Sequence, residues 1–286
     1  MRLPEDHVLW FIGVSGGADS MSLLRRALEH GMRLHVLTFN HAFADEHGDE
    51  EEAFVREQCT ELNVPLTIGH PKEPWTSKES KETFARRVRF DFFQSVAKDR
   101  LLLAHHADDR AENLILRLMR GCGLEGLTSF GWEAHIGTLR IVRPLIDETH
   151  AQQTAWLTQH GYRWIEDVSN TDRSIPRNAL RAFLNQSLPT FLSGATVSLD
   201  LLTEENAFLS HLTNAAVEIE SPLALRLRPH TDTVLIRRAV HQWLMNAFGH
   251  TATRRQMSQL LERGIRELSP SLRIDHVSEM LWERRI

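Results

Sequence analysis

A short segment rich in serine and glycine, at residues 15–20, has the residue types of a phosphate-binding turn. An apolar run precedes it and an amphipathic stretch follows, which predicts a turn between a strand and a helix. Gly16 and Gly17 lack Cβ atoms and let the backbone approach a phosphate closely. The following helix offers free N–H groups and the positive end of its dipole to an anion, and the hydroxyl groups of Ser15 and Ser20 add donors.

Asp19 lies in the same turn, where its carboxylate cannot bind a phosphate directly. We expect it to hold Mg²⁺ or to cap the helix. The pattern GxxxxGK[ST] does not occur, so this is not the Walker-type loop of a kinase or GTPase. A glycine turn that only caps a helix is the alternative for the segment taken alone, and the motifs farther along the chain weigh against it.

The first half of the chain alternates apolar runs with amphipathic stretches, and this pattern predicts the elements that position the turn. We expect strands at residues 7–14, 33–40, 65–69, 101–105 and 140–145, and helices at 20–30, 49–62, 78–97, 108–119 and 149–160. The predicted fold class is α/β, with a doubly wound, mostly parallel, five-stranded sheet covered by helices on both faces. Such sheets bind ligands beyond the carboxyl ends of their strands, where the polar motifs of this chain lie.

The alternation stops after about residue 188. Helices are expected at 198–220, 233–247 and 253–267, with a pair of short strands within 273–285. Pro189 and the Ser193-Gly194 pair mark a plausible boundary. The chain is therefore predicted to form an α/β domain at residues 1–190 and a small, mainly helical domain at 191–286.

The composition excludes several classes of protein. Cys59 and Cys122 form no CxxC pair, so neither a disulfide framework nor a zinc or iron–sulfur site is visible in the sequence. No apolar run is long enough to span a bilayer, and the N-terminal stretch lacks the form of a secretory signal, so we expect a cytoplasmic protein without membrane contact.

The charges of the chain are segregated along the sequence. The net charge of −5 argues mildly against a nucleic-acid binder. However, the stretch from residue 226 to residue 285 contains eleven arginines and only six acidic residues. This distribution permits a basic face on an acidic protein.

The turn Ser15-Gly16-Gly17-Ala18-Asp19-Ser20 resembles SGGxDS, the signature of the PP-loop ATPases. Members of that superfamily typically split ATP to AMP and pyrophosphate. They adenylate a carbonyl oxygen, and a nucleophile then displaces AMP.

Further segments resemble one family within it, the tRNA isoleucine lysidine synthetases. They are Asn40-His41 at a strand end, ETFARRVRF at 82–90, AHHADDRAEN at 104–113 with RGCGLEGL at 120–127, and RPL at 143–145 with EDVSN at 166–170 and RNALR at 177–181. The resemblance covers residues 8 to 190, and the order and spacing of five motifs make it more specific than SGGxDS alone.

The resemblance implies a ligase that uses ATP and Mg²⁺. ATP would activate the 2-carbonyl of the wobble cytidine in isoleucine tRNA with a CAU anticodon. The side-chain amine of L-lysine would then attack that carbon to give lysidine, AMP and pyrophosphate. The resemblance further implies that residues 1–190 form the catalytic domain and that the domain at 191–286 contacts the tRNA. The family also makes a homodimer possible.

The resemblance also assigns roles to individual residues. The implied catalytic set is Asp19, Arg86, Asp109, Glu112 and Arg177, with Asp19 as the Mg²⁺ ligand. Substrate contacts are expected from Arg86, Arg89, Asp109, Glu112, Arg177 and Arg181. Nucleotide contacts are expected from Ser15, Gly16, Gly17, Asp19, Ser20, Asn40 and His105.

Side-chain chemistry is consistent with these roles. Asp109 and Glu112 are three residues apart and share a helical face, where they could bind the lysine ammonium or accept the proton that its amine loses. The arginines offer forked donors for a phosphate or a carboxylate. His105 and His106 are expected to line the nucleotide pocket, because a metal site would need further ligands at workable spacing.

Two departures from the family pattern leave alternatives open. Arg110 replaces the usual Gln and Asn113 the usual Thr. A charge at Arg110 could pair with Asp109 or Glu112 and change the amine that those acids bind. The alternatives are another PP-loop enzyme that uses a different amine and, from a different class, a nucleotide- or tRNA-binding protein without catalysis. A thiolase of this type would usually carry CxxC pairs, and a glutamine-dependent amidotransferase an ammonia-generating domain with its own nucleophile.

Overall fold

The computed structural model of the chain describes residues 1–5, 8–43, 48–76, 78–166, 180, 183–184, 191–263, 266–269, 272–278 and 281–285. The chain divides into two compact units, Met1–Asp200 and Leu201–Ile286. The boundary expected at residue 190 lies at the start of helix α8 (Phe191–Ala216), which continues through Ser193 and Gly194 and crosses the division. Buried packing of Ala195 and Leu199 offsets the poor helix propensity of that glycine.

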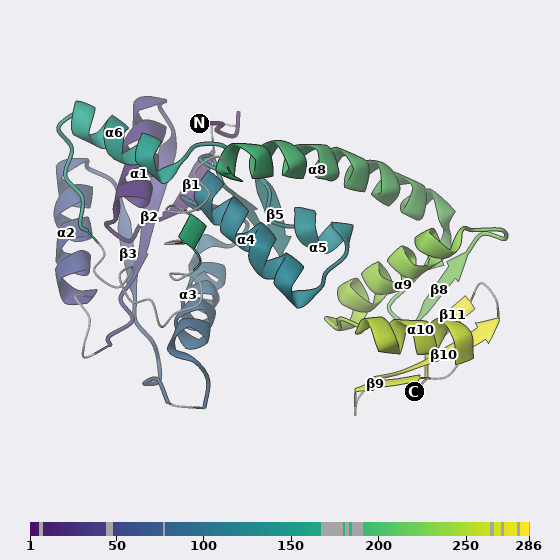
Figure 1. The fold of residues 1–286 in the computed structure, drawn as a ribbon. Helices are drawn as coiled ribbons and strands as arrows, with labels where there is room; N and C mark the ends of the chain where they lie inside the picture. Colours follow the sequence, from purple (N-terminus) through teal and green to yellow (C-terminus); the bar gives the residue numbers. More distant parts are fainter. Residues whose placement is uncertain are drawn as a thin grey trace. The chain divides into compact units, whose positions relative to one another are not determined.

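A six-stranded sheet, in the order β3-β2-β1-β4-β6-β5, forms the centre of the first unit (Figure 1). Its strands are β1 (Leu9–Gly13), β2 (Arg33–Phe39), β3 (Leu66–Gly69), β4 (Arg100–Leu102), β5 (Glu133–Ile136) and β6 (Leu139–Val142). All neighbours pair in parallel except β5 and β6, which form an antiparallel pair. The predicted mostly parallel α/β sheet is confirmed. The number of five strands was wrong, because the alternation in the edge strand β5 spans only four residues, the lower limit of a strand signal, and its pairing with β6 defines it.

Helices cover both faces of this sheet. They are α1 (Ala18–Glu29), α2 (Gly48–Glu61), α3 (Lys81–Ala97), α4 (Ala107–Arg120), α5 (Leu124–Thr128) and α6 (His150–Gln159). Trp10 and Ile12 of β1 pack into a core with residues of α1, α2 and α6, whereas Phe11 packs into the core shared with α3. This alternation is expected of a strand buried on both faces, and it confirms the doubly wound arrangement.

The strand order reverses between β1 and β4. From β1 the chain moves outward through β2 to β3, and then returns to the other side of β1 to form β4. The carboxyl ends of β1 and β4 therefore flank the topological switch point, where α/β sheets of this kind bind ligands. Helix α1 begins after β1 and helix α4 begins after β4, so both N-termini lie at this crevice.

The second unit combines helices with an antiparallel sheet. Helices α9 (Thr233–Phe248) and α10 (Arg254–Arg263) accompany the strands β7 (Val217–Glu220), β8 (Ala224–Leu227), β9 (Arg266–Ser269), β10 (Leu272–Ser278) and β11 (Leu281–Arg285). Trp243, Trp282 and Ile274 are among the buried residues that join the helices to the sheet. The helical part of the prediction is confirmed. Of the sheet, only the terminal pair was predicted, because β7 and β9 are short and extend helical patterns in the sequence.

No helix in the described part of the chain has the length and apolar content needed to cross a membrane.

The loop after β2 contains a backbone position that suits glycine. Ala42 has a φ of +53°, and its N–H donates to Oδ1 of Asn40 at 2.9 Å. A left-handed conformation costs an L-residue other than glycine about 1–2 kcal/mol. The Ala42→Gly variant should therefore gain up to about 1 kcal/mol in the free energy of unfolding, measured in urea, after the greater entropy of the unfolded glycine chain is subtracted. The exposed Ala53→Gly variant within α2 should lose a similar amount, so losses in both variants would contradict this account.

Candidate active site

The turn at residues 15–20 is held by its own serine hydroxyls. Ser20 Oγ donates to the carbonyl of Gly17 at 2.9 Å and accepts from the N–H of Ser15 at 3.2 Å. Gly16 has a φ of +91°, a conformation that glycine adopts without strain. Gly17 is the N-cap of α1 and has no side chain with which to cap that helix end. The first turn of α1 is therefore open toward an anion, as the sequence predicted.

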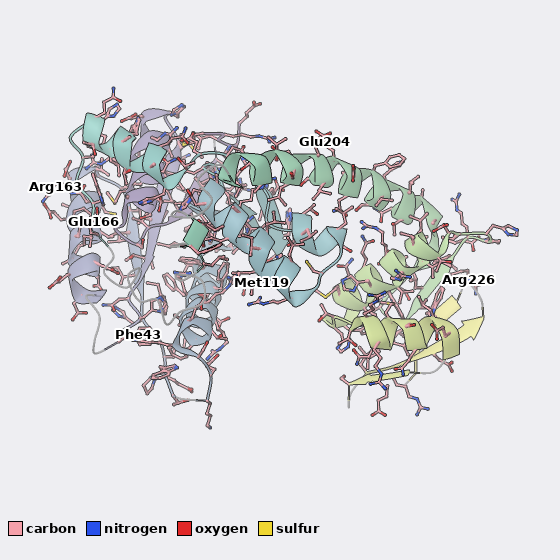
Figure 2. The ribbon with its side chains drawn as sticks, in the orientation of Figure 1. Phe43, Met119, Arg163, Glu166, Glu204 and Arg226 are labelled. Carbon is pink, nitrogen blue, oxygen red and sulfur yellow. The ribbon has the colours of Figure 1, made fainter. Side chains whose placement is uncertain are left out.

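The segment after α6 supports the turn from outside. Ile165 N–H donates to the carbonyl of Gly16 at 2.9 Å. Arg163 and Glu166 flank this residue on the segment beside α2 (Figure 2), and Arg163 pairs with Glu57 of α2 at 2.5 Å. These contacts hold the carbonyl side of the turn. They do not involve the N–H groups at the start of α1.

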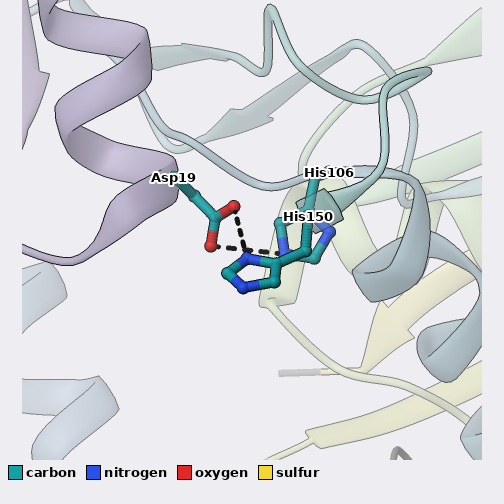
Figure 3. A group of neighbouring side chains, drawn as sticks. All are labelled: Asp19, His106 and His150. Atoms are coloured by element: carbon teal, nitrogen blue, oxygen red, sulfur yellow. Dashed lines mark hydrogen bonds and ion pairs between the residues drawn. The ribbon is translucent and has the colours of Figure 1, made fainter. Parts of the chain in front are cut away.

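Asp19 does not cap the helix; its carboxylate faces two imidazoles (Figure 3). Oδ1 lies 2.9 Å from Nδ1 of His150, and Oδ2 lies 3.5 Å from Nε2 of His106. The three side chains come from the starts of α1, α4 and α6. The capping alternative for Asp19 is thus wrong, because Gly17 occupies the cap position.

Two more carboxylates complete the cluster. Asp109 accepts from the backbone N–H of His106 at 3.1 Å, and its Oδ2 lies 3.5 Å from Nε2 of the same residue. Asp108 accepts from the backbone N–H of His150 at 2.8 Å, and its Oδ2 lies 3.0 Å from Nδ1 of His106. Asp108 therefore orients both histidines, while Asp109 faces the same imidazole nitrogen as Asp19.

The charges of the cluster stabilise one another. Burial disfavours a charge on His106, but the carboxylates of Asp108 and Asp19 outweigh it and raise its pKa to about 10. The hydrogen bond to Asp19 raises the pKa of His150. Burial would raise the pKa of Asp19, yet the two imidazoles hold it well below its usual value. Opposite charges at these distances favour the ionised forms of both partners.

A ladder of polar contacts between α1 and α6 positions His150. Ser22 Oγ, one turn beyond Asp19, donates to Oε1 of the fully buried Gln153, one turn beyond His150. Farther along α1, Arg26 pairs with Glu148, which lies just before α6, at 2.5 Å. His150 was not among the residues predicted from the sequence. The RPL motif gave a usable signal, since it ends a parallel strand whose helix must begin at the same sheet edge as α1 and α4.

A second group of residues lies near the cluster on the α3 side. Arg143 donates through Nε to Nδ1 of His105 at 3.3 Å and lies over the ring of Phe130. Burial and the charge of Arg86 lower the pKa of Arg143 to about 10, against the opposing effect of Asp109. Arg86 is exposed on α3. The structure thus brings Arg86 within electrostatic range of Arg143, and Arg143 within range of Asp109.

The remaining predicted residues occupy different environments. Asn40 is buried and donates to Oδ1 of Asp49 at 2.8 Å, so its side chain ties the loop after β2 to α2. Arg89 lies near His41, and burial together with this arginine lowers the pKa of His41 to about 4. Glu112 is 1% exposed, one turn along α4 from Asp109. Arg177 and Arg181 lie outside the described residues.

Arg110 does not pair with Asp109 or Glu112. Its guanidinium is buried and lies 2.7 Å from Oδ1 of Asp200 on α8 and 3.5 Å from Oδ1 of Asp147. The expectation that Arg110 could pair with Asp109 or Glu112 is therefore not met. The side chain points from α4 toward α8, because that is where exposed carboxylates can neutralise it.

Known protein families now give a context for this geometry. A model of the PP-loop domain matches residues 2–188, more than half of the chain. The chain belongs to the PP-loop domain family. The PP-loop unit also shares its fold with a U34-tRNA thiolase from Methanococcus maripaludis, at a TM-score of 0.57 and 17% identity over 70% of this chain and 72% of that one.

Several curated relatives of this PP-loop protein carry the name tRNA(Ile)-lysidine synthase. The protein from Pseudomonas fluorescens (strain Pf0-1) is 38% identical over 60% of this chain and 40% of its own length. The protein from Nitrosomonas europaea is 32% identical over 73% of this chain and 47% of its own length. The protein from Vibrio vulnificus (strain CMCP6) is 29% identical over 88% of this chain and 61% of its own length. The match thus spans 40 to 61% of the length of these three relatives.

The placement of Arg110 gives a stability prediction. The Arg110→Gln variant should lose about 1–2 kcal/mol in the free energy of urea unfolding, because a charge-assisted contact between α4 and α8 is removed while the half-exposed acids stay hydrated. The matched Arg120→Gln variant changes an exposed residue of the same helix and should lose less than about 0.5 kcal/mol. Equal losses in the two variants would show that the contact does not stabilise the unit.

Proposed function

We propose that the protein is an AMP-forming ligase that modifies the wobble cytidine of isoleucine tRNA with a CAU anticodon. The observation that carries this proposal is that Asp19 of the SGGADS turn and Asp109 of α4 meet around His106 at the switch point between β1 and β4. The similarity to proteins named tRNA(Ile)-lysidine synthase supplies the substrate. In the proposed reaction ATP adenylates the 2-carbonyl of the cytosine, and the side-chain amine of lysine displaces AMP.

The open N-terminus of α1 supports the nucleotide part of the proposal. The backbone N–H groups of that first turn and the hydroxyl of Ser15 are placed to bind phosphate oxygens. The carboxylates of Asp19 and Asp109 each lie 3.5 Å from Nε2 of His106, so their oxygens converge on one region. This fits Mg²⁺, which proteins commonly hold by one or two carboxylates together with substrate phosphates. When bound, the ion would neutralise phosphate charge beside these acids.

The acids on α4 support the amine part. Asp109 and Glu112 are both buried and one turn apart, so a lysine ammonium that lies between them would exchange its hydration for two carboxylates. One of them would then accept the proton that the amine loses as it attacks. Arg86 offers an exposed guanidinium for the carboxylate of the amino acid or for phosphate. We propose the same type of contact for Arg89, Arg177 and Arg181.

Exposed arginines support tRNA binding by the second unit. They are Arg228, Arg237, Arg254, Arg255 and Arg273. Among the described residues, none of these five guanidinium groups forms an ion pair with an acid. Unpaired surface arginines are suited to bind backbone phosphates, which position a nucleic acid without reading its sequence. We also infer a location in the cytosol, where tRNA and ATP are both present.

The proposal is tested by single-turnover assays with unmodified CAU-anticodon isoleucine tRNA, ATP, Mg²⁺ and labelled lysine. We expect equal amounts of AMP and of label in the tRNA. The Asp19→Ala variant should lower AMP formation by about 100-fold or more and leave tRNA affinity nearly unchanged, because it removes the proposed cation ligand and no tRNA contact. The exposed Asp91→Ala variant on α3 is the control and should keep full activity.

The outcomes of this assay separate the alternatives. Bound tRNA without AMP or label would refute the enzyme and leave a nucleic-acid-binding protein. AMP formation that responds to a different amine would refute lysine alone. The direction of Arg110 toward α8 favours lysine, because it removes the feature that cast doubt on the amine.

Binding of tRNA should weaken steeply with salt if the arginines of the second unit contact phosphates. Each lost phosphate contact makes the plot of log K against log salt concentration less steep by about 0.7–0.9. The double variant Arg254→Ala, Arg255→Ala should therefore reduce that slope by about 1.5, measured by filter binding. Arg56→Ala, in the acidic helix α2, is the control and should leave the slope unchanged. An unchanged slope in the double variant would exclude these two residues from the interface.

A further inference from the structure

Three side chains gather nitrogen and oxygen ligand atoms beside the turn, and a fourth, that of Asp109, lies next to one of them. The ligand atoms of Asp19, His106 and His150 all lie within 4.8 Å of one another. The closest pairs are 2.9 Å and 3.5 Å apart, and Asp109 Oδ2 lies 3.5 Å from the same nitrogen of His106. Zinc bound tetrahedrally at about 2.0–2.1 Å requires ligands about 3.3 Å apart. The geometry of the cluster already approaches this arrangement.

The residues around His106 are arranged like those that hold a metal-binding histidine in place. Its Nε2 faces the cluster, and its Nδ1 lies 3.0 Å from Oδ2 of Asp108 on the opposite side. Metal-binding histidines commonly direct their second nitrogen at a carboxylate in this way, which fixes the ring orientation. Asp108 also accepts from the backbone N–H of His150, so one carboxylate contacts both histidine residues. His106 is 4% exposed and cannot turn away to solvent.

The choice of ion follows from the ligand types. Mg²⁺ prefers oxygen ligands in octahedral geometry, whereas imidazole favours zinc, cobalt and other first-row transition ions. We propose that Asp19, His106 and His150, with Asp109 alongside, form a binding site for a divalent transition-metal ion of the zinc class. The site binds such an ion more tightly than Mg²⁺ and does so without nucleotide.

The position of the site links it to the proposed reaction. Asp19 belongs to the first turn of α1, so an ion held there lies next to the open helix N-terminus. A transition ion could then neutralise phosphate charge in the place assigned to Mg²⁺. This consequence rests on the proposed function, whereas metal binding by the protein alone does not.

Metal binding is measured first, on untagged full-length protein without ATP. Calorimetry with Zn²⁺ and visible absorption with Co²⁺ should show one site per chain, with a dissociation constant at least tenfold lower than that for Mg²⁺. His150→Ala should weaken Co²⁺ binding at least tenfold, and Asp19→Asn should do the same. Asp108→Asn should weaken it by about 10- to 100-fold, as expected for a residue that orients a ligand. His160→Ala, at the other end of α6, is the matched control and should bind like the wild type.

Circular dichroism of each variant establishes that it is folded before titration. Co²⁺ binding that is equal in wild type, His150→Ala and Asp19→Asn would overturn the proposal, and so would equal affinity for Mg²⁺ and Zn²⁺. AMP formation is measured separately with Mn²⁺, Co²⁺ and Mg²⁺. No AMP with any ion, together with His150-dependent Co²⁺ binding, would refute the proposed ligase and leave the metal site standing.

Discussion

One buried imidazole faced by three carboxylates is the interaction on which the arrangement of the first unit depends. Asp19, Asp108 and Asp109 lie 3.5, 3.0 and 3.5 Å from the ring nitrogens of His106. Carboxylates gathered in a partly buried crevice repel one another, and each loses hydration. The imidazole and the backbone N–H groups of residues 106 and 150 offset these costs. The cluster therefore persists only while three helices from distant parts of the sequence start at the same edge of the sheet.

The order of the strands provides that convergence. Because β1, β4 and β6 are parallel, the helices that follow them all begin at the carboxyl edge, and their N-terminal dipoles favour negative charge there. The same dipoles would favour the phosphates of a nucleotide. Carboxylates and phosphates cannot share this edge without cations between them. Positive charge, from side chains such as His106 or from a bound cation, is therefore a physical requirement of such a site.

The sequence predicted the elements that have a clear local hydrophobic pattern. It did not predict the elements that form only through pairing with another part of the chain. The parallel strands and α1 to α4 follow from apolar periodicity and from glycine at the turn. Strands β5, β7 and β9 have four residues each, so the alternation in β5 and β7 is too short to predict a strand without the partner that pairs with it. The turn and Asp109 were predicted from motifs. His150 was not, since its motif gave only the edge of the sheet at which α6 begins, whereas contacts between α1 and α6 set its position against Asp19.

Arg110 shows how a substitution inside a motif is absorbed by a residue outside it. A guanidinium beside buried acids would neutralise them if its side chain turned inward. Helix α8 prevents this, because Ala195 and Leu199 pack against α4 and bring Asp200 within 2.7 Å of the guanidinium. The charge is thus satisfied on the face of α4 that lies away from His106. Asp109 and Glu112 keep their places on the crevice side, so the effect of a changed motif residue can be judged only together with the partner that the fold supplies.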